Sequence, residues 1–110
     1  MIFNDSVNVT LREKRFVGGT QTTVVAFQGD VPGIVTFLDS ATTFDPAGGK
    51  VSSRLRVFLS PFAFVLPPMP ATGLLTLSWR QFTTLIVEGI VEPHYQSGRL
   101  HHYEILAKAV

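Results

Sequence analysis

The residues best suited to metal or acid–base chemistry lie near the carboxyl end of the chain. His94, His101 and His102 stand close together, between Glu92 and Glu104. Imidazole and carboxylate groups bind zinc, but a zinc site needs three or four ligands that converge on one ion. Adjacent residues of a strand point to opposite faces, so we expect His101 and His102 not to share an ion.

His94 belongs to an expected loop before the last strand and can meet one of the other two histidines across a hairpin. A small metal-using enzyme built on His94, His101 and Glu104 is therefore one hypothesis. We favour the simpler interpretation, in which the histidines are solvated or hydrogen-bonded side chains. The prediction is that the protein binds no metal and no cofactor.

The rest of the chain offers little for catalysis. It has no cysteine nucleophile and no Gly-x-Ser-x-Gly segment. Its eight acidic residues are scattered, whereas glycosidase-type chemistry requires two carboxylates that face one cleft. Gly48-Gly49-Lys50 lacks the serine or threonine and the helix of a phosphate-binding loop. We therefore expect no catalytic residues and no enzymatic activity.

The composition indicates a folded protein with a surplus of apolar surface. Hydrophobic residues make up 45% of the 110 residues and charged residues 15%, against about 25% charged in a typical domain, which excludes intrinsic disorder. The nine phenylalanines exceed what one small domain must bury, and uncovered apolar surface normally becomes a protein interface. A net charge of +1 is too small for a dedicated nucleic-acid-binding protein.

Disulfides and thiolate metal sites are excluded because the chain contains no cysteine. No apolar run reaches the about 18 residues of a membrane span, and the N-terminus lacks the pattern of a signal peptide. We expect a soluble cytosolic protein with no membrane partner.

Alternation of apolar and polar residues predicts β-strands along most of the chain. Val7, Val9 and Leu11 alternate with polar neighbours, which is the period of a half-buried strand. No segment has the 3.6-residue period of a helix, and Gly89 is expected to mark a bulge. The expected strands cover 7–12, 22–28, 34–38, 51–60, 74–79, 82–93 and 101–110. We predict one all-β domain, 1–110, a small barrel or sandwich of about six to seven strands.

Two segments interrupt this pattern. Residues 39–53 are mostly polar and contain Asp45-Pro46 and Gly48-Gly49, which oppose regular structure, so we predict one long loop. Residues 60–72 form a proline-rich apolar connector. Because proline cannot donate to a sheet, the connector either docks on a neighbouring molecule or folds back over an open end of the barrel.

Arg54, Arg56 and Phe58 share one face of the expected strand 51–60. Basic residues interleaved with an aromatic can bind single-stranded nucleic acid on a small barrel. Arginine is also enriched where proteins meet, because its planar head offers many donors. We favour the second role and predict a docking surface that also contains Phe62, Phe64 and Trp79.

The second half of the chain resembles a family of viral proteins. Three segments are similar to the head-closure, or stopper, proteins of long-tailed bacteriophages: Ser53-Arg54-Leu55 through Pro61, Val87-Glu88-Gly89 with Pro93, and the last strand from His101 to Leu106. The resemblance covers about residues 50–110. The first half agrees with the family only in the layout of its strands.

The resemblance implies a viral structural protein of the virion neck, assembled in the host cytoplasm. Such a barrel forms a ring of identical copies, six- or twelve-fold, beneath the portal and adaptor. A tail terminator or tail tube docks below, and double-stranded DNA passes through the channel. The loop 39–53 is then the element that gates the channel, through Asp39, Thr42, Thr43, Phe44, Asp45 and Lys50.

Two alternatives remain open. Another neck protein, such as a tail terminator or an adaptor, is close to the stopper in composition and fold. From a different class, a barrel that binds single-stranded nucleic acid would use Arg54, Arg56 and Phe58.

Overall fold

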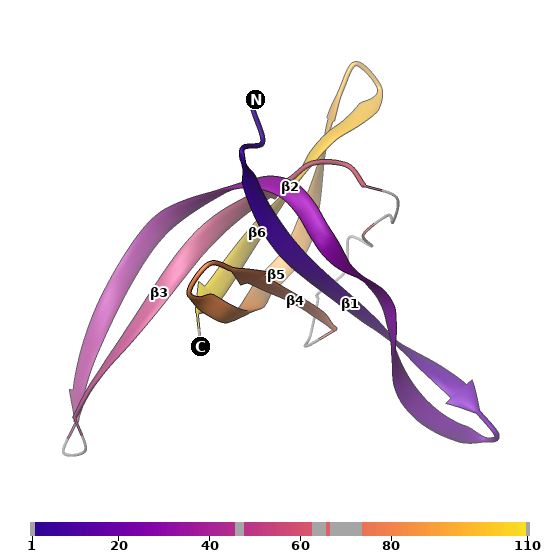
Figure 1. Ribbon diagram of the computed structural model, residues 1–110, viewed down its shortest axis with the longest axis horizontal. Coiled ribbons are helices and arrows are strands. Elements are labelled where there is room, and N and C mark those ends of the chain that lie inside the picture. Colours follow the sequence, from indigo (N-terminus) through magenta and orange to yellow (C-terminus); the bar gives the residue numbers. More distant parts are fainter. Residues whose placement is uncertain (1, 46–47, 63–65, 67–73, 110) are drawn as a thin grey trace.

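The structure, a computed structural model, describes residues 2–45, 48–62, 66 and 74–109, and between residues 39 and 52 it describes only the backbone. The described residues form six strands (Figure 1), and none belongs to a helix long and apolar enough to span a bilayer. The strands are β1 (Asp5–Val17), β2 (Thr20–Asp45), β3 (Gly48–Leu59), β4 (Leu75–Trp79), β5 (Phe82–Gln96) and β6 (Arg99–Ala109). The prediction of an all-β fold is confirmed.

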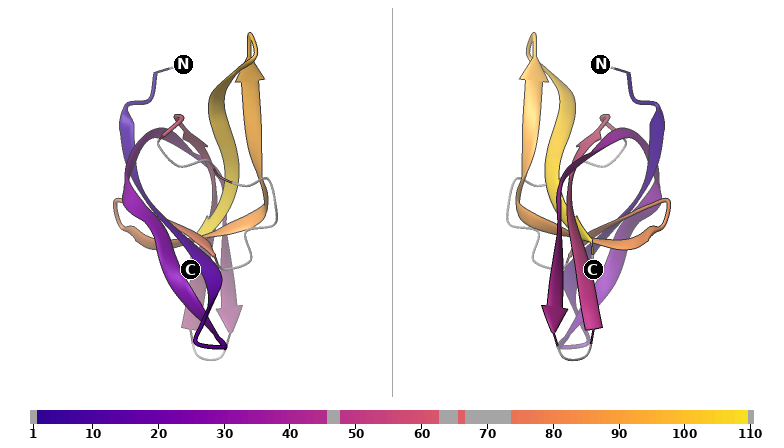
Figure 2. Two further views of the ribbon diagram at one scale, coloured as in Figure 1. Left: turned by 90° about the vertical axis from the view of Figure 1, so that its right-hand side faces the viewer. Right: turned by 90° about the vertical axis from the view of Figure 1, so that its left-hand side faces the viewer.

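The strands close into a barrel in the order β1-β2-β3-β6-β5-β4. Every neighbouring pair is antiparallel, and the ring of strands is visible in the side views of Figure 2. The short strand β4 completes the ring, and its pairing with β1 runs only from Asn8↔Ser78 to Leu11↔Leu75. The predicted small barrel is therefore the observed architecture.

Residues that alternate along a strand point alternately into the barrel and out to its surface. On β3, Leu55, Val57 and Leu59 are fully buried, whereas Arg54 and Arg56 are exposed. This follows because successive side chains of a strand point to opposite faces of the sheet. The core side chains are Val7, Val9, Leu11, Val31, Leu55, Val57, Leu59, Leu66, Leu75, Leu77, Trp79, Leu85, Val87, Val91, Tyr103, Ile105 and Ala107.

Strand β2 is long because it pairs with both of its neighbours in turn. It pairs with β1 up to Gly33 and with β3 from Gly33 onward, so Gly33 lies opposite Asp5 on one side and Leu59 on the other. A Cβ atom here would stand 2.6 Å from the carbonyl oxygen of Phe58, so the close approach of the two backbones requires glycine. The two strands predicted at 22–28 and 34–38 are therefore one continuous strand.

Three strand pairs continue beyond the barrel as two-stranded ribbons (Figure 1). They are the β1–β2 ribbon (residues 12–25), the β2–β3 ribbon (39–53) and the β5–β6 ribbon (94–102). In the first two ribbons, each strand pairs only with the other strand of the ribbon. The ribbons extend the molecule, so its radius of gyration is 15.6 Å, above the about 13 Å of a compact domain of this length.

The prediction of a long loop at 39–53 is wrong. Strand β2 continues to Asp45 and β3 starts at Gly48, with regular pairing from Ser40↔Ser53 to Asp45↔Gly48. Hydrogen bonds to the partner strand satisfy the backbone of this polar segment, and its threonines suit an extended chain. Of the residues expected to oppose regular structure, Asp45 ends β2 and Gly48-Gly49 begin β3.

Gly89 lies in a bulge, as predicted. Between the pairs Glu88↔Leu106 and Glu92↔Glu104, residues 89–91 of β5 lie opposite Ile105 alone. Gly89 has a φ of 73°, in the left-handed region that favours glycine. The expected loop at 94–99 is shorter than predicted, because β5 runs to Gln96 and the turn Ser97-Gly98 leads directly into β6.

The described part of the connector folds back over the barrel. The ring of Phe62 lies 5.0 Å from that of Phe27 and 6.2 Å from that of Tyr103, between centroids. Leu66 is only 2% exposed, and its backbone N–H donates a 3.2 Å hydrogen bond to the hydroxyl oxygen of Tyr103. Residues 60–62 and 66 thus follow the fold-back alternative, while Phe64 and the rest of the connector lie outside the described residues.

Replacing Gly33 with alanine tests the close contact between the backbones of β2 and β3. The new Cβ would collide with the carbonyl oxygen of Phe58, so we expect a loss of about 1–3 kcal/mol in the free energy of unfolding. Gly29→Ala is the matched control, because its nearest neighbour is the ring edge of Phe27 at 3.3 Å, which can move. Urea unfolding followed by tryptophan fluorescence measures both, and equal stability of the two variants would contradict this role for Gly33.

Replacing Tyr103 with phenylalanine tests the attachment of the connector. The substitution keeps the buried ring and leaves the N–H of Leu66 without its acceptor, so we expect about 1–3 kcal/mol of destabilisation. Tyr95→Phe is the control, since Tyr95 is 68% exposed and should change the free energy of unfolding by less than about 0.5 kcal/mol. A Tyr103 variant as stable as the wild type would show that the hydrogen bond does not hold the connector.

Candidate functional site

The residues predicted to line a channel lie on the β2–β3 ribbon. Their cross-strand pairs are Asp39↔Arg54, Thr42↔Val51, Thr43↔Lys50, Phe44↔Gly49 and Asp45↔Gly48. Their side chains lie outside the described part of the structure. The backbone nevertheless brings all six residues together on one ribbon that projects from the barrel (Figure 1).

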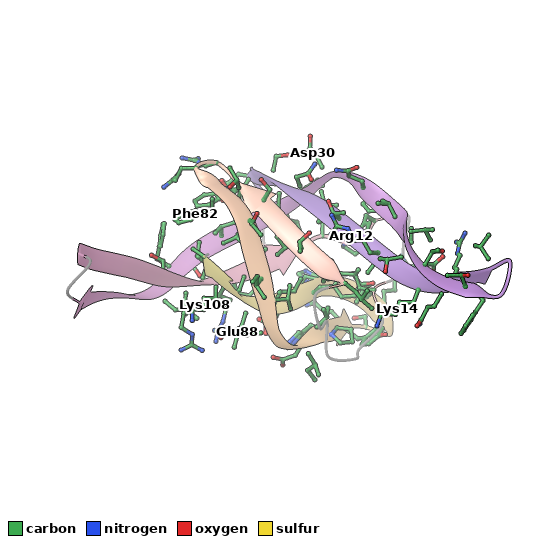
Figure 3. The ribbon with its side chains drawn as sticks, turned by 90° about the horizontal axis from the view of Figure 1, so that it is seen from below. Arg12, Lys14, Asp30, Phe82, Glu88 and Lys108 are labelled. Carbon is green, nitrogen blue, oxygen red and sulfur yellow. The ribbon has the colours of Figure 1, made fainter. Side chains whose placement is uncertain are left out.

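Arg54, Arg56 and Phe58 share the outer face of β3, as the alternation predicts. Both arginines are exposed, and Nε and Nη2 of Arg54 each lie 3.3 Å from one carboxylate oxygen of Glu88. Lys108 lies opposite Arg54 on β6 and is labelled with Glu88 in Figure 3. Phe58 is half-buried, with its ring 5.7 Å from that of His102. The face is therefore a charged patch, which we call the β3–β6 basic face (Arg54, Arg56 and Lys108).

Trp79 is not an exposed docking residue, so this prediction is wrong. Its side chain is 8% exposed and belongs to the core. It stacks on Phe82 with centroids 6.1 Å apart and an interplanar angle of 7°, and it meets Phe37 edge-on at 6.1 Å. The guanidinium of Arg80 lies 5.0 Å from the indole ring, where a cation is attracted to the π-face. Trp79 therefore packs with other aromatics of its own chain, as does Phe62.

Exposed apolar side chains gather on the ribbons and on the strands that lead into them. The β1–β2 ribbon carries the first group, Phe16, Val17 and Val25. The second group, Phe37 and Leu38, lies where β2 leaves the barrel for the β2–β3 ribbon. The other exposed residues are Ile86 and Ile90 on β5 and Tyr95 on the β5–β6 ribbon. We call the first group the β1–β2 patch and the second the β2 patch. Sequence reasoning missed both, because the ribbons and the register that turns these side chains outward are tertiary features.

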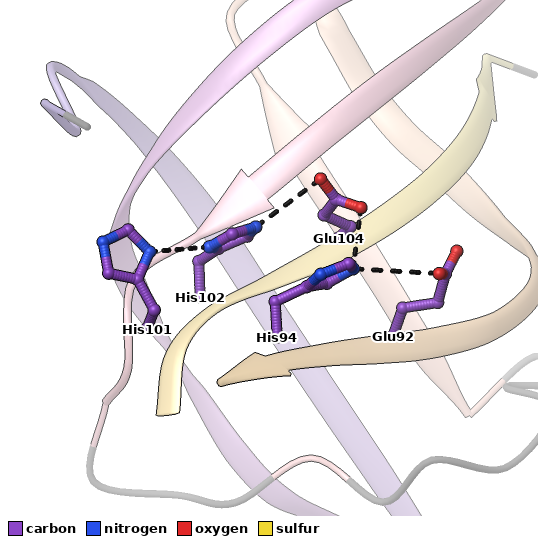
Figure 4. Close-up of polar contacts among 5 residues, drawn as sticks. All are labelled: Glu92, His94, His101, His102 and Glu104. Carbon is purple, nitrogen blue, oxygen red and sulfur yellow. Dashed lines mark hydrogen bonds and ion pairs between the residues drawn. The ribbon is translucent and has the colours of Figure 1, made fainter. Parts of the chain in front are cut away.

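The histidines form a cluster on the outer face where the β5–β6 ribbon joins the barrel (Figure 4). His94 lies directly opposite His102, and Glu92 lies opposite Glu104. The two imidazole rings are stacked, with centroids 4.9 Å apart and an interplanar angle of 3°. Nε2 of His94 lies 2.8 Å from Oε2 of Glu104 and 3.7 Å from Oε1 of Glu92, and Nε2 of His102 lies 3.5 Å from Oε1 of Glu104.

The cluster differs from the set that the sequence suggested. His94, His102 and Glu104 place one ligand atom each within 4.8 Å of one another, so His102 takes the place expected for His101. His102 is buried rather than solvated, because it lies between His94 and Phe58. His101 is not part of this set, although its Nδ1 lies 2.8 Å from Nδ1 of His102. The expected meeting of His94 with another histidine across a hairpin is confirmed.

The histidine cluster is suited to metal binding. Two imidazole nitrogens and a carboxylate on one face can bind a divalent metal ion. The β3–β6 basic face and the apolar patches have no such reactive geometry, and they suit contacts with other macromolecules.

No protein-family model matches this chain, and no curated protein is significantly similar to it. The function is therefore argued from the closed barrel, the exposed apolar patches and the three ribbons.

Proposed function

We propose that this chain is the subunit of a ring in the head-to-tail connector of a long-tailed bacteriophage, the head-closure or stopper ring. It is a structural protein of the virion neck, assembled in the host cytoplasm and without catalytic activity. Its partners are further copies of itself, the portal or adaptor ring above and the tail terminator or tail tube below. Double-stranded DNA passes through the channel of the ring.

The observation that supports this proposal best is the placement of exposed apolar side chains on opposite sides of the molecule. In Figures 1 and 3 the β1–β2 and β2–β3 ribbons leave the barrel toward opposite sides. Phe16 on the first ribbon is 77% exposed, and Phe37 at the base of the second is 56% exposed. Large apolar side chains that stay uncovered in one chain normally lie in a protein interface.

The opposed patches favour a contact between unlike surfaces of identical subunits. When one surface of a subunit binds a different surface of the next copy, the assembly closes into a ring if the rotation permits. The β1–β2 patch of one subunit is then covered by the β2 patch of its neighbour. A ring of this kind, six- or twelve-fold, also explains the low charge and high phenylalanine content of the chain.

The ribbons themselves support assembly. An isolated two-stranded ribbon is only marginally stable in water, because it has no third strand and no packed face. Residues 14–23 of the β1–β2 ribbon are exposed almost throughout. A neighbouring subunit supplies the missing surface and protects the unpaired strand edges from uncontrolled association.

The β2–β3 ribbon is the element that we assign to the channel. Its polar sequence, with Asp39 and Asp45, opposes the phosphates of DNA, and Lys50 partly offsets this charge. As a paired ribbon it projects farther and more rigidly than a loop of the same length. Repeated around a ring, the ribbons narrow the channel at one level and hold the packaged genome.

The β3–β6 basic face suits the partners above or below the ring, because arginine binds partner carboxylates through several donors. The same face is the basis of the alternative function as a single-stranded nucleic-acid-binding barrel. That alternative is less well supported, since Arg54 is paired with Glu88 and Phe58 packs on His102. Oligonucleotide binding by the monomer that weakens steeply with salt would favour it.

Substitutions in the two patches test the ring. Phe16→Ser and Leu38→Ser each remove one side of the proposed contact, so we expect either variant to be monomeric under conditions in which the wild type forms rings. Tyr95→Ser removes an equally exposed aromatic from the β5–β6 ribbon and should leave the ring intact. Size-exclusion chromatography with light scattering and native mass spectrometry measure the copy number. A wild-type chain that stays monomeric, both alone and with portal and adaptor proteins, would refute the proposal.

Shortening the β2–β3 ribbon tests the gate. Residues 41–52 are removed and Ser40 is joined to Ser53 by Asn-Gly, which suits a two-residue hairpin turn. We expect an unchanged thermal midpoint and intact rings, but filled heads that lose their DNA. The corresponding removal of residues 15–22 from the β1–β2 ribbon should instead prevent ring formation, because it deletes Phe16 and Val17. Heads that retain their genome with the short β2–β3 ribbon would contradict the gating role.

A further inference from the structure

The histidine cluster presents a charge problem that the described residues do not solve. Glu92 and Glu104 lie directly opposite each other on neighbouring strands, and like charges in such a pair destabilise a sheet. Among the described residues, the ion-pair partners of these two acids are His94 and His102, with no lysine or arginine. A cation bound between the two strands would offset this pair of negative charges.

The two imidazoles of the cluster lie close together. The rings of His94 and His102 are stacked face to face with their centroids 4.9 Å apart, and His102 is largely buried. A divalent cation bound to both imidazoles would offset the charge of the two carboxylates.

The ring nitrogens that face the carboxylate are available for such a cation. Nε2 of His94 and Nε2 of His102 are both buried, and neither has a hydrogen-bond partner. The close approach of His94 Nε2 to Glu104 thus lacks the direction of a hydrogen bond. Buried polar atoms without a partner are rare in native proteins, and an ion bound at these two nitrogens would account for them.

Two of the three distances between the donor atoms are close to those of one tetrahedral ion, and one of the two parallel rings must turn for both Nε2 lone pairs to meet at that ion. Ligand bonds of about 2.0–2.1 Å to zinc place two tetrahedral ligand atoms about 3.3 Å apart. The distances from Glu104 to the two Nε2 atoms, 2.8 and 3.5 Å, lie on either side of this value. Figure 4 shows both rings directing Nε2 toward the same carboxylate.

We propose that His94, His102 and Glu104 bind one Zn²⁺ ion, with a fourth coordination position open to water or to Glu92. Two imidazoles and one carboxylate suit zinc, whereas Mg²⁺ and Ca²⁺ prefer oxygen ligands alone. The ion would link β5 to β6. It would lie just beyond the bulge at Gly89, at which the register of the two strands changes. This site is independent of the proposed connector function.

His101 is a positioning residue for this site. Its Nδ1 lies 2.8 Å from Nδ1 of His102, so one nitrogen must donate and the other accept. When Nδ1–H of His102 donates, its Nε2 carries the lone pair that binds the metal. Such a partner fixes the tautomer and orientation of a ligand histidine.

Titration of the full-length, tag-free and metal-stripped chain with ZnCl₂ in a calorimeter tests the site. We expect saturable binding of one ion per chain and a thermal midpoint that rises with zinc, because the ion binds the folded state. His94→Gln and His102→Gln should each weaken binding by more than about 100-fold. His101→Gln should weaken it by the about 10–100-fold typical of an outer partner.

Glu104→Gln and Glu92→Gln form a matched pair on opposite strands. The first should reduce zinc affinity strongly and the second only slightly, and neither changes the volume of its side chain much. Circular dichroism shows whether each variant is folded, and Co²⁺ absorption reports the four-coordinate geometry independently of affinity. Absence of one-to-one zinc binding by the wild type, binding that survives in His94→Gln and Glu104→Gln, or equal affinity for Mg²⁺ would overturn the proposal.

Discussion

Closure of the barrel brings the backbones of β2 and β3 into close contact at Gly33. There β2 passes from pairing with β1 to pairing with β3, and the carbonyl oxygen of Phe58 occupies the space that any Cβ would need. A side chain at this position would push β2 away from β3. The pairing on either side of Gly33 sets which side chains of β2 are enclosed and where the strand leaves the barrel.

The core and the ribbons are two consequences of this closure. A barrel of six strands has room for the side chains of its inner face only, and these are aliphatic residues with Trp79 and Tyr103. Several strands are longer than the barrel requires, so their ends continue as two-stranded ribbons. Phe16 is exposed on such a ribbon, whereas Phe37, at the edge of the barrel, packs on Trp79 and Phe82 and remains 56% exposed. The proposed ring places the same kind of side chain against a neighbour, where burial again removes apolar surface from water.

On the outer face of β5 and β6, two polar ring atoms are buried without a hydrogen-bond partner. Most exposed charged groups are solvated or paired, as Arg54 is with Glu88. At His94 and His102, stacking and the cover of Phe58 remove water from two ring nitrogens that remain without a hydrogen-bond partner. This combination of burial and missing partners makes the cluster chemically distinct, and neither feature follows from residue type alone.

Local alternation was sufficient to predict the all-β fold, the inward residues of β3 and the bulge at Gly89, because these depend on the period of a strand and on backbone conformation. The paired ribbon at 39–53, the burial of Trp79 and the choice of His102 over His101 were not predictable in this way. Each depends on which distant segment lies opposite, and a shift of one residue in register exchanges the faces of a strand. Residue alternation therefore indicates the strands of the barrel and the apolar face of each. Strand partners, the length of the ribbons and the meeting of polar side chains follow from the folded chain, because they depend on contacts between segments that are remote along the sequence.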